Sequence, residues 1–157
     1  MHTVSDIVVN LAADHAGLAH KDAVRAWLRS ERVTVTDHGP LTLDLNDDFP
    51  DYIGPAASAV SIDPLRQRAI IFGGSGQGEA MAANRYPYVR AAVYYGGPEE
   101  IVTLSREHND ANVLSFGARF LDIDTTKRLI WEWLHTEPLT EQKYARRNRK
   151  LEQLPRV

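Results

Sequence analysis

The sequence predicts an α/β fold in which five parallel strands form one sheet with helices on both of its faces. Short apolar runs alternate with amphipathic segments along the whole chain, a pattern typical of parallel sheets with right-handed crossovers. The 157 residues, 43% of them hydrophobic and 25% charged, suffice for one domain with a sizeable core. No repeat, low-complexity segment or linker interrupts the pattern, so residues 1–157 are expected to form a single domain.

The first half of the chain contains two predicted strands and two predicted helices. "DIVVNLA" at 6–12 is a short apolar run with β-branched residues, as in a buried strand. The turn "ADHAG" leads into an amphipathic helix over 17–30, whose apolar residues recur at helical spacing. "VTVTD" at 33–37 is the second strand, and a long loop then reaches a helix that begins near Pro50.

The second half continues the alternation. The strand "RAIIFGG" at 68–74 runs directly into a glycine loop, and "GEAMAANR" forms the helix that leaves it. A strand at 89–95, a helix at 97–109 and a strand at 111–117 follow. The chain closes with a helix over 122–135, for which Asp122 is the expected N-cap, and a basic helix within 140–153.

Composition limits the classes of partner. The net charge of -3 argues against a general nucleic-acid binder, although "QKYARRNRK" in the last helix leaves RNA binding by the tail as a weak alternative. No apolar run is long enough to span a membrane, and the start lacks the pattern of a secretory signal. The chain has no cysteine, which removes disulfides and thiolate chemistry. We therefore expect a cytoplasmic protein without membrane or nucleic-acid partners.

The glycine loop "GGSGQGEAM" at 73–81 approaches two phosphate-binding motifs and fits neither. Gly73 and Gly78 have Walker A spacing, but Glu79 and Ala80 replace the lysine and hydroxyl residue. The glycines also miss the dinucleotide pattern. A loop of backbone N–H groups before a helix can instead stabilise an anion that arises only after Glu79 has removed a proton, as with an enediolate. The alternative is that Glu79 is simply an acid favoured at a helix start.

Other polar candidates follow the strands, where ligands of such sheets bind. Asp14 follows the first strand and either serves the site or caps the next helix. Arg119 follows the fifth strand, whereas His108 stands at a helix end, where a structural role is common. Asp14, His15 and His108 could suggest a metal site, but no close-spaced ligand pair supports it. Lys143 and Arg147, one helical turn apart, could clamp one phosphate, and a neighbouring subunit could bring them to the rim.

Together these segments resemble the ribose-5-phosphate isomerase B family, which includes the galactose-6-phosphate isomerase subunits. The matching motifs cover nearly the whole chain: "DHAG", "FPDY", "GGSGQGEAMAANR", "EHNDANVLSFGAR" and "YARR". The resemblance implies a Rossmann-like three-layer sandwich that works as a homodimer or tetramer, with active sites between subunits. It implies aldose–ketose isomerisation of phosphosugars in the pentose phosphate pathway, through a cis-enediolate and without metal or cofactor. Because this chain lacks the cysteine of many members, it is similar to the group that uses a glutamate at the position of Glu79.

The same resemblance implies a role for each site residue. Glu79 would be the base and Ser75 would steady or protonate the enediolate oxygens, while Asp14 and His108 would serve ring opening and hydroxyl contacts. The remaining substrate-binding residues would be the loop glycines with their N–H groups, a neighbour of His108, and the phosphate ligands: Gly74, Gly76, Gly78, Asn109, His15, Arg119, Lys143 and Arg147.

The chain departs from the family pattern at two places. Lys143 and Tyr144 stand where the family usually has arginine and histidine, and Phe49 replaces a common tyrosine. Lysine keeps the charge but loses the bidentate fork of arginine. The reaction type survives these changes, and the resemblance implies interconversion of ribose 5-phosphate and ribulose 5-phosphate. An isomerase of another four- or six-carbon phosphosugar, and a non-catalytic phosphosugar-binding module, remain the alternatives.

Overall fold

The centre of the structure is one parallel sheet of five strands. The computed structural model describes residues 4–155, and the strands lie side by side in the order β2–β1–β3–β5–β4. All four neighbouring pairs are parallel. The strands are β1 (Val8–Ala13), β2 (Thr34–Asp37), β3 (Gln67–Gly73), β4 (Ala91–Tyr94) and β5 (Val113–Gly117).

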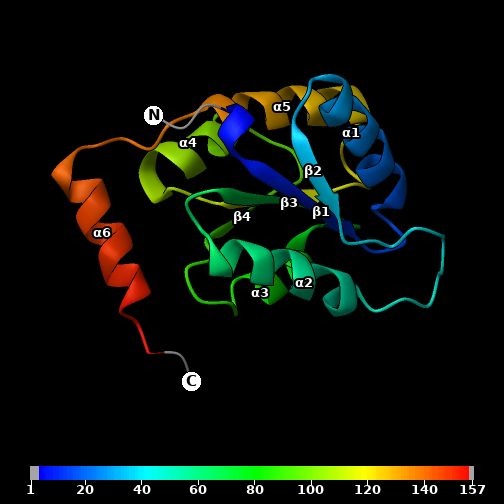
Figure 1. The fold of residues 1–157 in the computed structure, drawn as a ribbon, viewed down its shortest axis with the longest axis horizontal. Helices are drawn as coiled ribbons and strands as arrows, with labels where there is room; N and C mark the ends of the chain where they lie inside the picture. Colours follow the sequence, from blue (N-terminus) through cyan, green and yellow to red (C-terminus); the bar gives the residue numbers. More distant parts are fainter. Residues whose placement is uncertain (1–3, 156–157) are drawn as a thin grey trace.

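Helices cover both faces of this sheet, which gives the sandwich three layers (Figure 1). One face carries α1 (Leu18–Ser30), α4 (Glu100–Asn109) and α5 (Ile123–His135). The other carries α2 (Phe49–Ile62) and α3 (Gln77–Ala83). The predicted fold class is therefore confirmed. No helix among residues 4–155 has the length and apolar character that crossing a membrane requires.

The central strands are covered on both faces, which explains why their sequences are continuous apolar runs. Successive side chains of a strand point to opposite faces. On β3, Ile70 and Phe72 pack into the core under α1 and α5, whereas Ala69 and Ile71 pack under α2. All four are fully buried. A strand covered on both faces has no solvent side, so the apolar pattern does not alternate.

The predicted elements match the structure apart from their ends. The strand predicted at 89–95 is shorter, and the helix predicted at 97–109 begins at Glu100. Gly96 and Gly97 have positive φ angles of 125° and 93°, so the chain turns there before the helix starts. Asp122 is the N-cap of α5, as predicted, because its carboxylate accepts a hydrogen bond from the Thr125 N–H.

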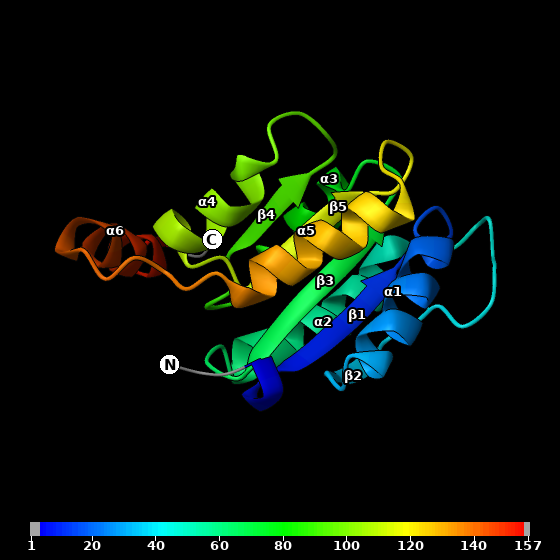
Figure 2. The same cartoon turned by 90° about the horizontal axis from the view of Figure 1, so that it is seen from above.

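The last helix, α6 (Gln142–Glu152), stands to one side of the sandwich (Figure 2). It buries none of its residues. The segment before it and the helix itself lie beside the end of α4, because Leu139 N donates to Glu107 O (2.9 Å) and Asn148 Nδ2 donates to His108 O (3.2 Å). The structure thus leaves the basic surface of α6 outside the packed core.

Candidate active site

Three segments that follow neighbouring strands meet at the carboxyl edge of the sheet, as the sequence predicts. The N–H of Asp14, after β1, donates to Phe72 O on β3 (3.2 Å). The N–H of Arg119, after β5, donates to the carbonyl of Gly74 (3.2 Å). The strand order reverses between β1 and β3, and ligands of open α/β sheets bind at such switch points. The rim is therefore the candidate site.

Glu79 lies at the centre of this rim and is folded back over the end of β3. The residue is only 4% exposed, although an acid in the first turn of a helix is normally solvated. A Cβ atom added to Gly73 would lie 2.0 Å from both Cδ and Oε1 of Glu79. The carboxyl group thus occupies the space that a side chain at position 73 would need. Gly73 and the buried position of Glu79 depend on one another.

The surroundings of Glu79 favour its protonated form. Burial raises the pKa of Glu79 above its ordinary value. A hydrogen bond with the Glu79 backbone opposes this rise, and the negative charge of Asp14 adds to it. A base whose pKa moves toward neutrality can both take up and release a proton near physiological pH. An acid favoured only by the helix start would normally be solvated, whereas Glu79 is buried.

Asp14 holds the turn after β1 and does not cap α1. Its Oδ1 accepts the N–H groups of Ala16 (2.9 Å) and Gly17 (3.1 Å). The helix begins at Leu18 with Gly17 as its N-cap and without a side-chain cap, so the capping alternative is wrong. A Cβ on Gly17 would lie 2.5 Å from Phe72 Cβ. This close approach of the turn to β3 sets Asp14 beside Glu79.

The remaining loop residues shape the floor of the site. Gly76 has a φ of 79°, a left-handed conformation that favours glycine, and its carbonyl accepts the buried Ser115 hydroxyl (2.7 Å). The ring of Phe49 covers Gly78, where an added Cβ would lie 2.9 Å from Cζ. Ser75 is exposed at the tip, with Oγ accepting the Gln77 N–H (3.4 Å). The hydrogen bond from Ser115 and the contact with Phe49 hold the loop on its buried side, whereas Ser75 at its tip is exposed to solvent.

Arg119 and His15 border one side of the rim. The guanidinium of Arg119 lies over the loop, since a Cβ on Gly74 would be 3.0 Å from the Arg119 Cζ. His15 hydrogen-bonds through Nδ1 to Oδ1 of Asp47 (2.7 Å). Asp47 was missed by the sequence reasoning. It belongs to the run "DLNDDFPD", in which several carboxylates look alike, so no local signal distinguishes it.

The structure does not bring His108 and Asn109 to this rim within one chain. Helix α4 runs back along the sheet and ends where β5 begins. A strand of five residues spans roughly 15 Å, so both side chains lie at the opposite edge from Glu79. His108 stacks there on Tyr144, with ring centroids 4.6 Å apart and the planes at 6°.

Residues of α6 form part of this second cluster. Lys143 pairs with Glu141 (3.2 Å) and lies 4.8 Å from the Tyr144 ring centroid. Arg147 is exposed on the same helix. The predicted site residues therefore fall into two groups, one at the carboxyl ends of the strands and one at their amino ends. Within residues 4–155, no three His, Asp or Glu side chains are grouped to hold a metal ion.

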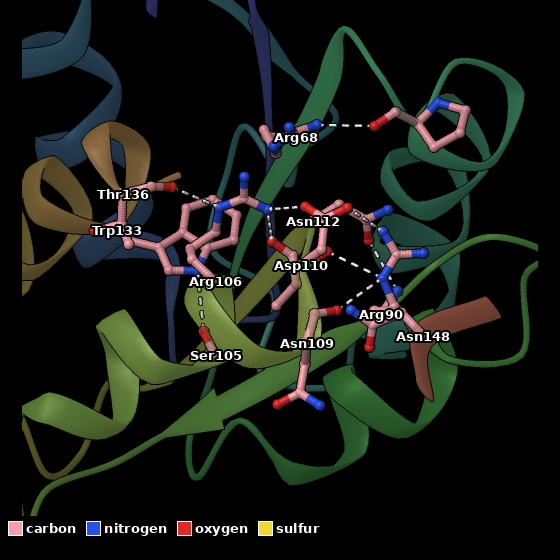
Figure 3. A network of polar contacts seen from close by, with 12 residues as sticks. Arg68, Arg90, Ser105, Arg106, Asn109, Asp110, Asn112, Trp133, Thr136 and Asn148 are labelled. Atoms are coloured by element: carbon pink, nitrogen blue, oxygen red, sulfur yellow. Dashed lines mark hydrogen bonds and ion pairs between the residues drawn. The ribbon is translucent and has the colours of Figure 1, made fainter. Parts of the chain in front are cut away.

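A network of arginines fixes the end of α4 (Figure 3). Asp110, in a left-handed conformation with φ 46°, accepts from Arg90 (3.0 Å) and from Arg106 (2.6 Å). Arg106 also donates to Ala111 O (2.7 Å). Burial, with Arg106 nearby, lowers the pKa of Arg68 to about 10, so that this arginine stays charged at neutral pH. The network holds the backbone that carries the second cluster.

The structure is an α/β sandwich whose rim holds a buried carboxyl group beside a glycine loop. The sequence profile of the family described as Ribose/Galactose Isomerase matches residues 9–152. The chain belongs to this family, as the sequence motifs predict.

Named relatives share its sequence over most of its length. Ribose-5-phosphate isomerase B of Mycobacterium tuberculosis is 32% identical, covering 92% of this chain and 87% of the relative. The protein of the same name from Escherichia coli is 32% identical, covering 80% and 82%.

Solved structures of the family resemble the whole fold. Ribose-5-phosphate isomerase B from Mycoplasma genitalium with bound ribulose-5-phosphate has a TM-score of 0.88 at 30% identity, covering 94% of this chain and 95% of that one. The enzyme from Anaplasma phagocytophilum has a TM-score of 0.85 at 33% identity, covering 96% and 99%.

Proposed function

We propose that this protein interconverts ribose 5-phosphate and ribulose 5-phosphate. The observation that carries the proposal is the buried carboxyl group of Glu79, held over the glycine loop beside Asp14. The relatives named ribose-5-phosphate isomerase B, and the similar structure with bound ribulose-5-phosphate, support the same substrate class.

In the proposed reaction Glu79 carries one proton between two carbon atoms of the open-chain sugar. The carboxylate removes the proton from C2 of the aldose, and the electron pair moves through the C1–C2 bond onto the aldehyde oxygen. The resulting cis-enediolate then takes the proton back at C1, while the proton of the C2 hydroxyl passes to the C1 oxygen, so that C2 becomes the carbonyl carbon of the ketose. The N–H groups of residues 74–78 and the Ser75 hydroxyl would stabilise the anion, whose charge exists only during the reaction.

Asp14 would contribute in two ways. Its charge keeps the pKa of Glu79 high, after the larger effect of burial, so that Glu79 can return the proton it has taken. Its position beside the base also suits contact with the sugar hydroxyls during ring opening. His108 and Asn109 would join this step from a second subunit.

We propose that the complete site forms between two copies of the chain. The rim holds the base, and the far edge holds His108, Lys143 and Arg147. A helix that buries none of its residues in its own chain suits a place on a partner. His15 and Arg119 would then meet Lys143 and Arg147 of the partner around the phosphate, where four cations favour a dianion. The subunit number, two or four, is measured by light scattering.

Mixing two inactive variants tests the shared site. Glu79→Gln removes the base from the rim and His108→Ala removes the partner's contribution. Heterodimers formed after mixing contain one site with both groups intact. Random exchange at equal amounts would restore about a quarter of the wild-type sites in a two-fold dimer. Activity that stays at the level of the separate variants would refute a shared site.

Two departures bear on the sugar. Lys143 offers the phosphate a point charge instead of a fork. Phe49 places its Cζ against Gly78, and that atom carries the hydroxyl in tyrosine. Comparing kcat/KM for aldose phosphates of four, five and six carbons identifies the substrate. We expect the highest kcat/KM for the five-carbon sugar. A higher kcat/KM for a four- or six-carbon sugar would identify that sugar as the substrate instead.

A non-catalytic binding module is the second candidate from a different class. It would bind ribose 5-phosphate without exchanging protons with the solvent. Incubation in heavy water separates the two, because the isomerase forms ribulose 5-phosphate and incorporates deuterium.

The cytoplasmic location stays a prediction, which fractionation of cells that produce the protein tests.

A further inference from the structure

Asp47 is a buried carboxylate at the end of an otherwise exposed loop. Residues 41–46 are all exposed, and they include Leu41 and Leu43 at 76% and 62%. The Asp47 side chain is only 2% exposed. Burying a charge is costly unless it is paired, so this position calls for a reason.

The partner of Asp47 is His15 on the catalytic rim. Oδ1 of Asp47 lies 2.7 Å from Nδ1 of His15, and a carboxylate can only accept, so Nδ1 must donate. Oδ2 is buried and accepts no hydrogen bond from the described residues 4–155. Within that part of the chain, the bond to Nδ1 is the contact through which the carboxylate is compensated. The bond also fixes the ring, because Nε2 must point away from Asp47.

Rigid elements hold the loop at both ends. At its start, Asp37 Oδ1 accepts the Gly39 N–H (2.9 Å), and the fully buried Lys21 donates to the same carboxylate (2.9 and 2.8 Å). At its end, helix α2 begins at Phe49, with a proline in its first turn. Asp47 is therefore placed by the fold and not by a freely moving loop.

The charges that face His15 are Asp47, Asp14 and Arg119. The hydrogen bond that His15 donates to Asp47 is the largest cause that raises the pKa of His15, and the charges of both carboxylates add to it. Partial burial and Arg119 oppose the rise. The balance favours a charged imidazole beside Arg119, on the side of the rim where a phosphate would be held.

We propose that Asp47 is a positioning residue that orients His15, so that its Nε2–H and positive charge face the phosphate group of the substrate. This inference rests on the proposed function. It assigns Asp47 to substrate affinity and not to proton transfer, because Asp47 contacts His15 while Glu79 and Asp14 form the reacting pair.

Asp47→Asn tests this assignment, with Asp48→Asn as its matched control. Asn keeps an acceptor for Nδ1 but removes the charge. Asp48 is the exposed neighbour, has no side-chain cap hydrogen bond and loses the same charge on substitution. We expect Asp47→Asn to raise KM about tenfold near pH 7.5, the size of effect seen for partners that orient metal-ligating histidines, with kcat changed less than about twofold. Asp48→Asn should leave both constants unchanged.

Direct titration of the imidazole by NMR supplies a readout that a merely structural role would not move. The His15 resonance, assigned by its absence in His15→Gln, should titrate above about pH 6.5 in the wild type and at lower pH in Asp47→Asn. Inorganic phosphate should bind more weakly to that variant. Asp47→Glu keeps the charge and should restore part of the affinity.

Three results would overturn the assignment. They are a wild-type His15 pKa at or below the ordinary value, an unchanged pKa in Asp47→Asn, and a loss confined to kcat. The wild-type titration needs no variant, so it decides even where Asp47→Asn does not fold. A wild type that fails to isomerise ribose 5-phosphate would refute the proposed function instead, while the NMR and phosphate titrations would still decide the role of Asp47.

Discussion

Gly73→Ala is the substitution that tests most sharply how the base is held. The new Cβ would lie 2.0 Å from Cδ and Oε1 of Glu79, and 2.2 Å from Oε2. Ordinary carbon contacts are about 3.5–4.0 Å, so the carboxyl group must move by roughly 1.5 Å or more. The group lies at the end of a flexible side chain, and Gly73 has no positive φ angle. The backbone can therefore stay in place while the base is displaced.

The expected loss follows from the size of this displacement. A misplacement of about 1 Å can cost about 100-fold, and a positioned base contributes about 10²–10⁴-fold. We expect kcat/KM to fall about 10²–10³-fold, which corresponds to about 3–4 kcal/mol. The Tm should change little, because the displaced group can rotate toward solvent. Initial rates of ribulose 5-phosphate formation and thermal unfolding measure the two effects.

A double-variant cycle shows whether the effect passes through Glu79. If it does, Gly73→Ala combined with Glu79→Gln loses no more activity than Glu79→Gln alone. Gly54→Ala in α2 is the control, since its added Cβ meets a flexible group, the Tyr86 hydroxyl at 3.0 Å. Near-wild-type activity of Gly73→Ala, or losses that multiply in the double variant, would show that Gly73 does not hold the Glu79 carboxyl group in place.

Three further predictions follow from the site and the core. Because burial and Asp14 raise the pKa of Glu79, the base is lost as pH falls through that raised value, and Asp14→Asn should move the acid limb of the kcat/KM profile to lower pH; an unmoved limb would contradict the coupling. Arg119→Gln should raise KM for the phosphorylated sugar about tenfold or more and leave an unphosphorylated sugar unaffected, and equal losses for both would remove Arg119 from the phosphate site. Lys21→Met breaks a buried ion pair with Asp37, and chemical unfolding should show that the free energy of unfolding falls by roughly 3 kcal/mol, the lower end for such pairs because Arg25 still contacts Asp37. An unchanged free energy of unfolding would show that the pair makes no net contribution to stability.

The sequence predicts the sheet well because its signals are local. A strand such as β3 is covered on both faces, so its apolar run and the glycine loop after it mark its position directly. The rule that carboxyl ends of parallel strands share one edge then places Asp14, Glu79 and Arg119 together, as the structure confirms.

The parts that were not predicted depend on long-range geometry. The contact between His15 and Asp47 joins residues 32 positions apart, and the acidic run around Asp47 contains no local distinction. The requirement for glycine at position 73 arises from where the Glu79 carboxyl folds back. The separation of His108 from Glu79 also depends on the fold, because the end of α4 lies at the amino ends of the strands whereas Glu79 lies at their carboxyl ends.

In the proposed mechanism, Glu79 carries a proton between C1 and C2 of the sugar. The most direct measurement is incubation of ribose 5-phosphate in heavy water with the wild type and with Glu79→Gln, following product and deuterium by NMR, together with Kd by calorimetry. We expect turnover and deuterium uptake by the wild type, a loss of about 10³-fold or more in Glu79→Gln, and a Kd changed by less than about threefold. Turnover by Glu79→Gln near the wild-type rate would contradict this mechanism.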